Sequence, residues 1–345
     1  MYLLPEKMRC RSFSSFLLVL SSSSRLVHPT SAFKTSLKRI PKPFGKTASS
    51  PGVTVSTKMF LSSPFSTTTT TNQGGENYHE ENLRFLVLDE PTESTQDEAK
   101  RLLAETDAQN SKKLLAVLAN QQTNGRGTKG RTWEGKKGNV HLTIAVPLDQ
   151  IPVTITLLPL QIGVLIANCL QDMLLKYHQI HDNNVQPMVK WPNDVLVDER
   201  KIAGVLIENW ISTSSSDQTC WFLVGIGINV AFAPSNLPAG VRPAACLHDF
   251  YEEELPESAA QDLGRDLTHA FMDWILVQES SPTIDRSEME AQVLKDWKSL
   301  TKFGQQYTIR ETGEQVTTLD IQSDGQLKVR GADGRERLLV SDYFH

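Results

Sequence analysis

The sequence predicts an α/β (α+β) fold in which a large domain of strands and helices is followed by a small β domain. Between residues 83 and 300, aliphatic runs of strand length alternate with longer apolar segments at helical spacing. From residue 306 onward the pattern changes to four short β-rich runs, with Asp324-Gly325 and Asp333-Gly334 as hairpin-turn dipeptides between them. We therefore expect a disordered targeting leader over 1–82, a large α/β domain over 83–300 and a small C-terminal β domain, SH3-like in type, over 301–345.

The elements of the large domain have local signals of their own. Ser94 is predicted to be a helix N-cap, with Asp97 three residues later as a weaker capping-box partner. Asp198-Glu199-Arg200 is the expected turn of a β-hairpin. The expected strands are 83–88, 114–119, 140–146, 194–197, 201–208, 220–225, 307–310, 316–321, 327–329 and 338–340. The expected further helices are 157–177, 262–279 and 287–300.

The net charge of −5 conceals a division between two parts of the chain. Residues 1–75 contain ten Lys or Arg, the single acidic residue Glu6 and 25 Ser or Thr. A basic, hydroxyl-rich and acid-poor leader is typical of an organelle targeting peptide. The remainder is acidic, which argues against general nucleic-acid binding, because such binding needs positive charge to release counterions from phosphates.

The leader also has the order of parts expected of a targeting signal. An apolar patch from Phe13 to Leu20 follows three cations and precedes Thr30-Ser31-Ala32-Phe33, which resembles a weak signal peptide cleaved after Ala32. The basic, Ser/Thr-rich continuation is similar to the two-part plastid leader of algae with complex plastids. We expect a plastid address in preference to a mitochondrial one, and an internal start at Met59 would give a cytosolic form.

Two other classes of protein are disfavoured by composition. No run of 18 or more apolar residues is present, which argues against a transmembrane helix. The four cysteines are too far apart to form a Cys-x-x-Cys pair, so neither a zinc site nor a disulfide framework is indicated.

The first segment whose residues are suited to ligand binding or catalysis is the loop from Gln121 to Trp133. Three glycines within six residues let its backbone approach a ligand closely. Arg126, Lys129 and Arg131 supply cationic donors suited to phosphate or carboxylate. Taken alone, the loop is equally compatible with a flexible basic surface loop.

The second segment is Lys190-Trp191-Pro192-Asn193-Asp194, followed across the hairpin turn by Lys201-Ile202-Ala203-Gly204. Pro192 cannot donate to a ladder, so a kink there is expected to present Asn193 and Asp194 at the sheet edge. An Asp carboxylate is a reasonable oxygen ligand for Mg²⁺, which binds phosphates with few protein carboxylates. A plain hairpin with solvated charges explains any one of these residues but not the whole string.

Two shorter motifs are weak by themselves. Ser94-Thr95-Gln96 is readily explained as a helix cap. The Gly225-x-Gly227 pair after a strand suggests a dinucleotide fold, but a third glycine, a following helix and a later acidic residue are not evident. A nicotinamide dehydrogenase is therefore the weakest alternative.

Taken in this order, the segments resemble the catalytic core of the biotin–protein ligases, and the resemblance runs from about Leu83 to the C-terminus. It implies an α/β domain with a mixed sheet, related to class II aminoacyl-tRNA synthetases, followed by the small β domain. The implied reaction is ATP-dependent biotinylation, through biotinyl-5′-AMP, of a lysine on the biotin carboxyl carrier domain of a carboxylase. ATP, Mg²⁺ and biotin are the implied cofactor and substrates, and the protein is expected to be a monomer or homodimer.

The resemblance also implies a role for each matching residue. The catalytic pair would be Lys201 and Arg126, and the metal ligand would be Asp194. The biotin-binding residues would be Ser94, Thr95, Gln96, Gln121, Arg126, Gly127, Thr128, Lys201, Gly204 and Gly227. The ATP-binding residues would be Arg126, Arg131, Trp133, Lys190, Asn193 and Asn229.

The sequence departs from the bacterial pattern of this family at two positions. Thr128 stands where many bacterial members have another arginine, which leaves open how tightly the adenylate is retained. Gln96 stands where asparagine is common. Residues 1–82 show no amphipathic helix pair that could form the DNA-binding domain of some bacterial members, so we expect no nucleic-acid partner and no membrane partner. The alternatives within reach are a lipoate or octanoate–protein ligase or transferase and a non-catalytic biotin-binding regulator.

Overall fold

The structure is a computed structural model. It describes residues 76–80, 82–105, 113–176, 185–211, 219–238, 241–280, 285–309 and 312–340. The predicted targeting leader lies almost entirely outside these residues, as do its expected cleavage site and the internal start.

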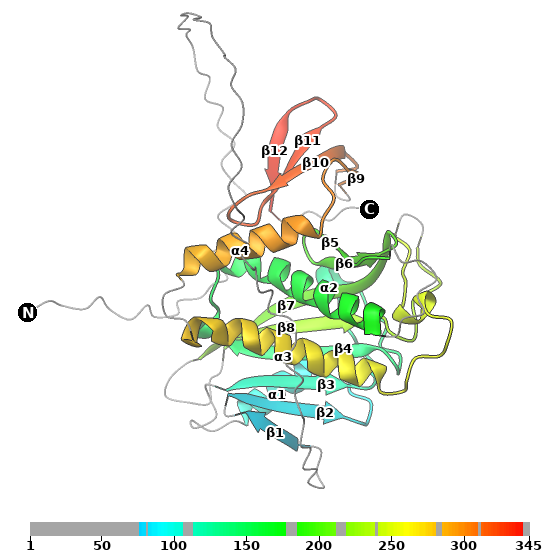
Figure 1. Cartoon of the computed structure of the whole chain (residues 1–345), viewed down its shortest axis with the longest axis vertical. Helices are drawn as coiled ribbons and strands as arrows, with labels where there is room; N and C mark the ends of the chain where they lie inside the picture. The colour runs from blue at the N-terminus through cyan, green and yellow to red at the C-terminus, as the bar shows by residue number, and fades with distance from the viewer. Residues whose placement is uncertain are drawn as a thin grey trace, which may run out of the picture. The chain divides into compact units, whose positions relative to one another are not determined.

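A mixed sheet of eight strands is the centre of the described chain (Figure 1). Its order is β1-β2-β3-β4-β8-β7-β6-β5, and β2 and β3 are parallel whereas the other neighbours are antiparallel. The strands are β1 (Glu76–Glu80), β2 (Leu83–Leu88), β3 (Leu114–Ala119), β4 (Val140–Pro147), β5 (Met188–Lys190), β6 (Asp194–Val197), β7 (Arg200–Ile211) and β8 (Cys220–Ile228).

Both faces of this sheet are covered by helices, which explains why β3 and β4 are buried along their whole length. Leu115 and Val117 of β3 pack in one apolar cluster with Leu102 and Leu103 of α1 (Thr95–Ala104). The alternate residues of β3 belong to the larger cluster on the opposite face. That face is covered by α2 (Leu158–Lys176) and α3 (Ala259–Ser280), and α4 (Arg286–Ser299) packs against α2.

The longest apolar helix of the described residues is a core helix. The stretch Ile155–Lys176 has a mean hydropathy of 1.5 and is long enough to cross a membrane, but 72% of its apolar window is buried inside the protein. Leu160, Ile166 and Leu170 of α2 are among the fully buried side chains. Its hydropathy is therefore accounted for by packing against the sheet and the neighbouring helices.

A second, antiparallel sheet follows α4, with the order β12-β11-β10-β9. Its strands are β9 (Gln306–Thr308), β10 (Gln315–Ile321), β11 (Leu327–Gly331) and β12 (Glu336–Leu339). Gly325 and Gly334 have φ of +82° and +78°, the left-handed conformation that the two predicted turns require. Trp191 fastens this sheet to the large one, because its Nε1 donates to the carbonyl oxygen of Gly325 at 3.0 Å.

The predicted elements are present, with two additions. The sequence analysis missed β1 and β5, which are the two edge strands of the large sheet. Strand β1 begins at Glu76 and pairs with β2, so it lies within the stretch that was predicted as leader. Short edge strands have little apolar content, so the pattern search had no signal for them.

Candidate active site

The segments singled out in the sequence meet around one pocket of about 730 Å³. Three parts of the fold supply most of its lining: the start of α1, the loop between β3 and β4, and the adjacent strands β7 and β8. Strands β7 and β8 are paired so that Gly204 lies opposite Gly227 and Leu206 lies opposite Gly225. Gly204, Gly225 and Gly227 therefore form the floor of the pocket. Because glycine has no side chain, a ligand can approach the strand backbone closely there.

The loop from Gln121 to Trp133 is folded back on itself. Trp133 N donates to Gly125 O at 2.9 Å, and Gly127 N donates to Arg131 O at 2.7 Å. A Cβ at Gly125 would lie 2.5 Å from Trp133 O, so only glycine allows this crossing. Arg131 Nη2 donates to Thr128 Oγ1 at 2.5 Å, which places a guanidinium beside the position that lacks the bacterial arginine.

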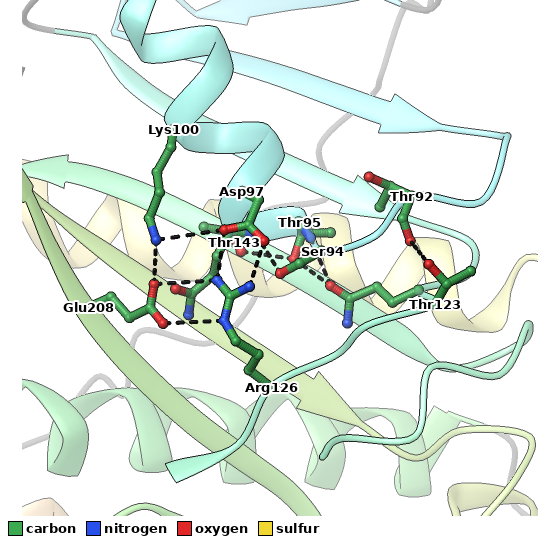
Figure 2. Close-up of polar contacts among 11 residues, drawn as sticks. Thr92, Ser94, Thr95, Asp97, Lys100, Thr123, Arg126, Thr143 and Glu208 are labelled. Carbon is green, nitrogen blue, oxygen red and sulfur yellow. Dashed lines mark hydrogen bonds and ion pairs between the residues drawn. The ribbon is translucent and has the colours of Figure 1, made fainter. Parts of the chain in front are cut away.

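A hydrogen-bonded cluster forms the polar end of the pocket (Figure 2). Gln122 Oε1 accepts from the backbone N–H of Thr95 at 2.7 Å and from Thr95 Oγ1 at 3.1 Å. Thr143 Oγ1 donates in turn to Thr95 Oγ1 at 2.8 Å. Ser94 is the N-cap of α1, as predicted, and its side chain accepts from Gln96 N. These bonds fix the rotamers of the side chains that a ligand would meet.

Three buried polar atoms of pocket residues have no hydrogen-bond partner among the described residues. They are Gln96 Oε1, Trp133 Nε1 and Asn193 Oδ1. Buried polar groups in folded proteins nearly always have partners, so each such atom calls for an explanation. All three belong to residues that line the same pocket, which makes this pocket the candidate ligand site.

Trp133 lies against the glycine floor. A Cβ at Gly227 would be 2.3 Å from Trp133 Cε2, and a Cβ at Gly204 would be 3.2 Å from Trp133 Cζ3. Lys201 Nζ lies 5.6 Å from the centroid of the indole. A flat aromatic surface and an ammonium group thus face the same space, as recognition of an anion attached to a planar ring requires.

A chain of charges runs from Lys201 away from the pocket. Lys201 Nζ lies 2.5 Å from Asp194 Oδ1, and Lys190 Nζ lies 3.8 Å from Asp194 Oδ2. Burial alone would raise the pKa of Asp194, but the two ammonium groups outweigh it and hold that pKa below its ordinary value. Burial lowers the pKa of Lys190 to about 8, although Asp194 partly opposes this.

The lowered pKa of Lys190 makes stability depend on pH in alkaline solution. Between about pH 8 and the ordinary lysine value near 10.4, the unfolded chain binds a proton at this residue that the folded protein has lost. Stability from this group therefore rises with pH across that window. The measurement is the free energy of unfolding of Lys190→Met and of wild type, determined with denaturant from pH 7 to 10.5. We expect the variant to compare best with wild type at the low end of this range. As pH rises, the free energy of unfolding of the variant should fall relative to that of wild type. A difference that is constant with pH would contradict the assignment.

Arg126 occupies the side of the pocket under α1 (Figure 2). Its Nη1 and Nη2 donate to the two carboxylate oxygens of Asp97 at 2.5 and 2.9 Å. Its Nε lies 3.4 Å from Glu208 Oε1. Asp97, expected as a capping-box partner, is therefore committed to Arg126, and the hydrogen bond to Arg126 holds the pKa of this carboxyl below its usual range.

One wall of the pocket had no signal in the sequence. The segment after β8 contributes Pro234, Leu237, Val241 and Arg242 to the lining. The end of this segment is held against β7 by backbone hydrogen bonds with Lys201. The N–H of Lys201 donates to the carbonyl oxygen of residue 243 at 2.8 Å. The segment has neither helical nor strand periodicity, so only its prolines and glycine marked it as a loop.

The structure brings together most of the residues that the sequence analysis named. Those that line the pocket are Ser94, Thr95, Gln96, Arg126, Gly127, Thr128, Arg131, Trp133, Asn193, Lys201, Gly204, Gly227 and Asn229. Three of the named residues, Gln121, Lys190 and Asp194, do not line it. Gln122 takes the place expected for Gln121, because neighbouring residues of an extended chain point in opposite directions. Lys190 is buried behind the pocket, and Asp194 is paired with lysines.

The fold and the site together define an α/β protein with one large pocket lined by glycines, by Trp133 and by cationic side chains. Residues 89–229 match the family model described as "Biotin/lipoate A/B protein ligase family". This part of the chain is therefore similar to the biotin/lipoate A/B protein ligases.

Individual relatives agree with the family. The chain is 35% identical over 153 residues to "Biotin--[acetyl-CoA-carboxylase] ligase" of Paracoccus denitrificans, covering 42% of this chain and 59% of that protein. It is 26% identical over 192 residues to "Bifunctional ligase/repressor BirA" of Escherichia coli, covering 55% of this chain and 47% of that protein. The chain thus spans about half the length of the curated relatives it matches.

A solved structure with the same fold is the biotin protein ligase from Aquifex aeolicus in complex with biotin and ATP. The TM-score is 0.54 and the sequence identity is 21%, with 77% of this chain and 98% of that chain covered. At this identity the likeness concerns the fold. The predicted mixed α/β architecture with a C-terminal β sheet is therefore confirmed.

Proposed function

We propose that this protein is a biotin–protein ligase that activates biotin with ATP and transfers it to a lysine of a biotin carboxyl carrier domain. The observation that carries the proposal is the convergence of Gln96 Oε1, Trp133 Nε1 and Asn193 Oδ1, all buried and unpartnered among the described residues, on the pocket that Lys201 also lines. The names of the relatives point to the same reaction.

In the first step a carboxylate oxygen of biotin attacks the α-phosphorus of ATP, and the bond to the pyrophosphate leaving group breaks. Both reactants are anions, so the site must offset charge and hold them in line. Lys201 is placed to do this, because its ammonium lines the pocket and is oriented by Asp194. In the second step the amine of the carrier lysine attacks the acyl carbon, AMP leaves and the amine loses a proton.

Biotin fits the polar end of the pocket better than lipoate does. Its ureido ring offers two N–H donors and a carbonyl acceptor, whereas the dithiolane ring of lipoate offers no N–H or O–H group. Gln96 Oε1 needs a donor and is buried beside the fixed Thr95–Gln122 cluster. Leaving such an atom unpaired is costly, so sites built to hydrogen-bond a ligand reject analogues that lack the group.

Magnesium is proposed as part of the MgATP substrate and not as a resident metal. The carboxylate of Asp194, the predicted metal ligand, is in contact with Lys201 Nζ and near Lys190 Nζ. Asp194 fits the role of a counter-ion that orients Lys201.

The proposal is tested by incubating the full chain with MgATP, biotin and an isolated biotin carboxyl carrier domain and probing for the biotinylated carrier. A parallel reaction contains lipoate and a lipoyl carrier domain. Biotin-dependent release of pyrophosphate without the carrier reports the first step separately. Labelling with lipoate alone would favour a lipoate ligase, and binding of biotin without pyrophosphate release would favour a non-catalytic regulator.

We also propose that residues 1–75 direct the protein to a plastid, because this stretch is basic, rich in Ser and Thr, and nearly free of acidic residues. Fused to a fluorescent reporter in an alga with a complex plastid, these residues are expected to give a plastid signal. A matched fusion with Lys and Arg of the stretch replaced by Gln should stay in the cytosol. A diffuse or mitochondrial signal from the unaltered leader would refute the plastid proposal.

A further inference from the structure

Four charged side chains form a cluster beside the pocket, under the first turns of α1 (Figure 2). They come from three separate segments: Asp97 and Lys100 from α1, Arg126 from the loop and Glu208 from β7. Lys100 Nζ lies 2.7 Å from Glu208 Oε2 and 3.7 Å from Asp97 Oδ1. The cluster is neutral as a whole, with two cations and two carboxylates.

Arg126 is the member of this cluster that connects the three walls of the pocket. Its guanidinium makes a two-pronged contact with Asp97, and its Nε and Nη2 each lie 3.4 Å from an oxygen of Glu208. The guanidinium has a fixed planar fork, so a two-pronged contact with a carboxylate sets direction as well as distance. The loop is thereby fixed relative to Ser94–Gln96 at the start of α1 and to Gly204–Leu206 on β7, which also line the pocket.

The sequence pattern suggested a different use of Arg126, as a direct ligand of carboxylate or phosphate. Its donors on the side of Asp97 and Glu208 are already committed to two carboxylates. Direct anion binding through them would require the guanidinium to leave both acids. The loop instead offers the pocket its glycine backbone around Gly127 and the side chain of Thr128.

We propose that Arg126 is a positioning residue and that Asp97 and Glu208 are its specific partners, which together hold the Gly125–Trp133 loop in its ligand-binding position. The ligands concerned are the biotin and ATP of the proposed function, on which this inference rests. Asp97 and Glu208 act through the loop and contact no reacting atom. Lys100 compensates the second negative charge so that both acids can face one arginine.

A double-mutant cycle separates positioning from direct anion binding. The single variants are Arg126→Gln, Asp97→Asn and Glu208→Gln, with Arg126→Gln/Asp97→Asn as the double. The matched control is Glu98→Gln, an acid-to-amide change one residue away whose carboxylate pairs with Arg101 on the exposed side of α1. KM and kcat of biotin-dependent pyrophosphate release are measured for biotin and for ATP.

If the positioning role is correct, Asp97→Asn raises KM for both substrates by on the order of 10-fold or more, since small misplacements of binding groups are costly. The double variant is then no worse than Arg126→Gln alone, because the pair is already broken. If Arg126 binds the anion directly, Asp97→Asn frees the guanidinium and leaves KM for ATP unchanged or lower. That result, or additive losses in the double variant, would overturn the proposal.

Hydrogen exchange of the ligand-free full chain gives a readout that does not depend on activity. Amides of residues 125–133 should exchange faster in Asp97→Asn and Arg126→Gln than in wild type and in the Glu98→Gln control, at an unchanged thermal midpoint. If the amides of residues 125–133 exchange at the wild-type rate in these variants, the positioning role is refuted even if the protein is an active ligase. Conversely, an inactive wild-type protein with faster loop exchange in the variants would count against the proposed function alone.

Discussion

Replacing Lys201 with methionine is expected to lower the rate of adenylate formation by on the order of 10²-fold or more, since preorganised charge groups of this kind contribute a few kcal/mol to a transition state. Lys201 is a charged side chain that lines the pocket, lies 5.6 Å from the centre of the Trp133 indole and is held 2.5 Å from Asp194. Methionine keeps much of the length of the side chain and removes the ammonium. The measurement is single-turnover release of pyrophosphate from MgATP with saturating biotin.

The control for this change is Lys298→Met on α4. Lys298 also makes an ion pair, with Asp320 at 2.7 Å, but lies outside the pocket. Its loss should leave the rate of pyrophosphate release unchanged. Retention of a near-normal rate by Lys201→Met, with the control also normal, would remove Lys201 from the mechanism and leave Arg126, Arg131 and Arg242 as the pocket cations to examine.

Adding a single methyl group at Gly227 is expected to abolish detectable binding of biotin. The Cβ of Gly227→Ala would lie 2.3 Å from Trp133 Cε2 and 2.5 Å from Trp133 Nε1, far inside van der Waals contact. The backbone of Trp133 is held by the folded loop, in which Trp133 N donates to Gly125 O. Relief therefore requires the indole to leave the glycine floor, either by rotating its side chain or with the loop, and either movement changes the wall that Trp133 gives to the pocket. Isothermal titration with biotin measures the loss.

Gly163→Ala provides the matched control for this substitution. It makes the same chemical change in α2, where the nearest atom to the new Cβ is Val189 Cγ1 at an ordinary 3.5 Å. This variant should bind biotin as wild type does. If Gly227→Ala also binds normally, the indole is free to leave the glycine floor and the close contact has no role in ligand binding.

The large-scale organisation could be predicted because its signals are local. The strands Leu83–Leu88, Leu114–Ala119 and Asp194–Val197 have the predicted bounds, since each is a buried run that ends at polar or turn residues. The Gly125–Trp133 loop and Lys201 were found from residue type and order, and the structure places them in one pocket. Patterns of glycines and cations can be recognised in a single sequence because their chemistry depends on few neighbouring residues.

What the sequence did not predict depends on contacts between distant segments. Glu208 is 82 residues from Arg126, and nothing in either neighbourhood marks them as partners. The choice between Gln121 and Gln122 depends on which side of the extended chain faces the pocket. The burial of Lys190 depends on the second sheet, where its Nζ lies 5.6 Å from the centroid of the Tyr307 ring.

The hydrogen bond between Trp191 and Gly325 joins residues separated by 134 positions. During synthesis, which adds about 5–20 residues per second, the Lys190–Asp194 segment leaves the ribosome several seconds before Gly325 does. Until the last strands emerge, Trp191 and Lys190 lack the cover they have in the finished protein. The large sheet can therefore form early, whereas the surroundings that bury Lys190 beside Asp194 are completed only near the end of translation.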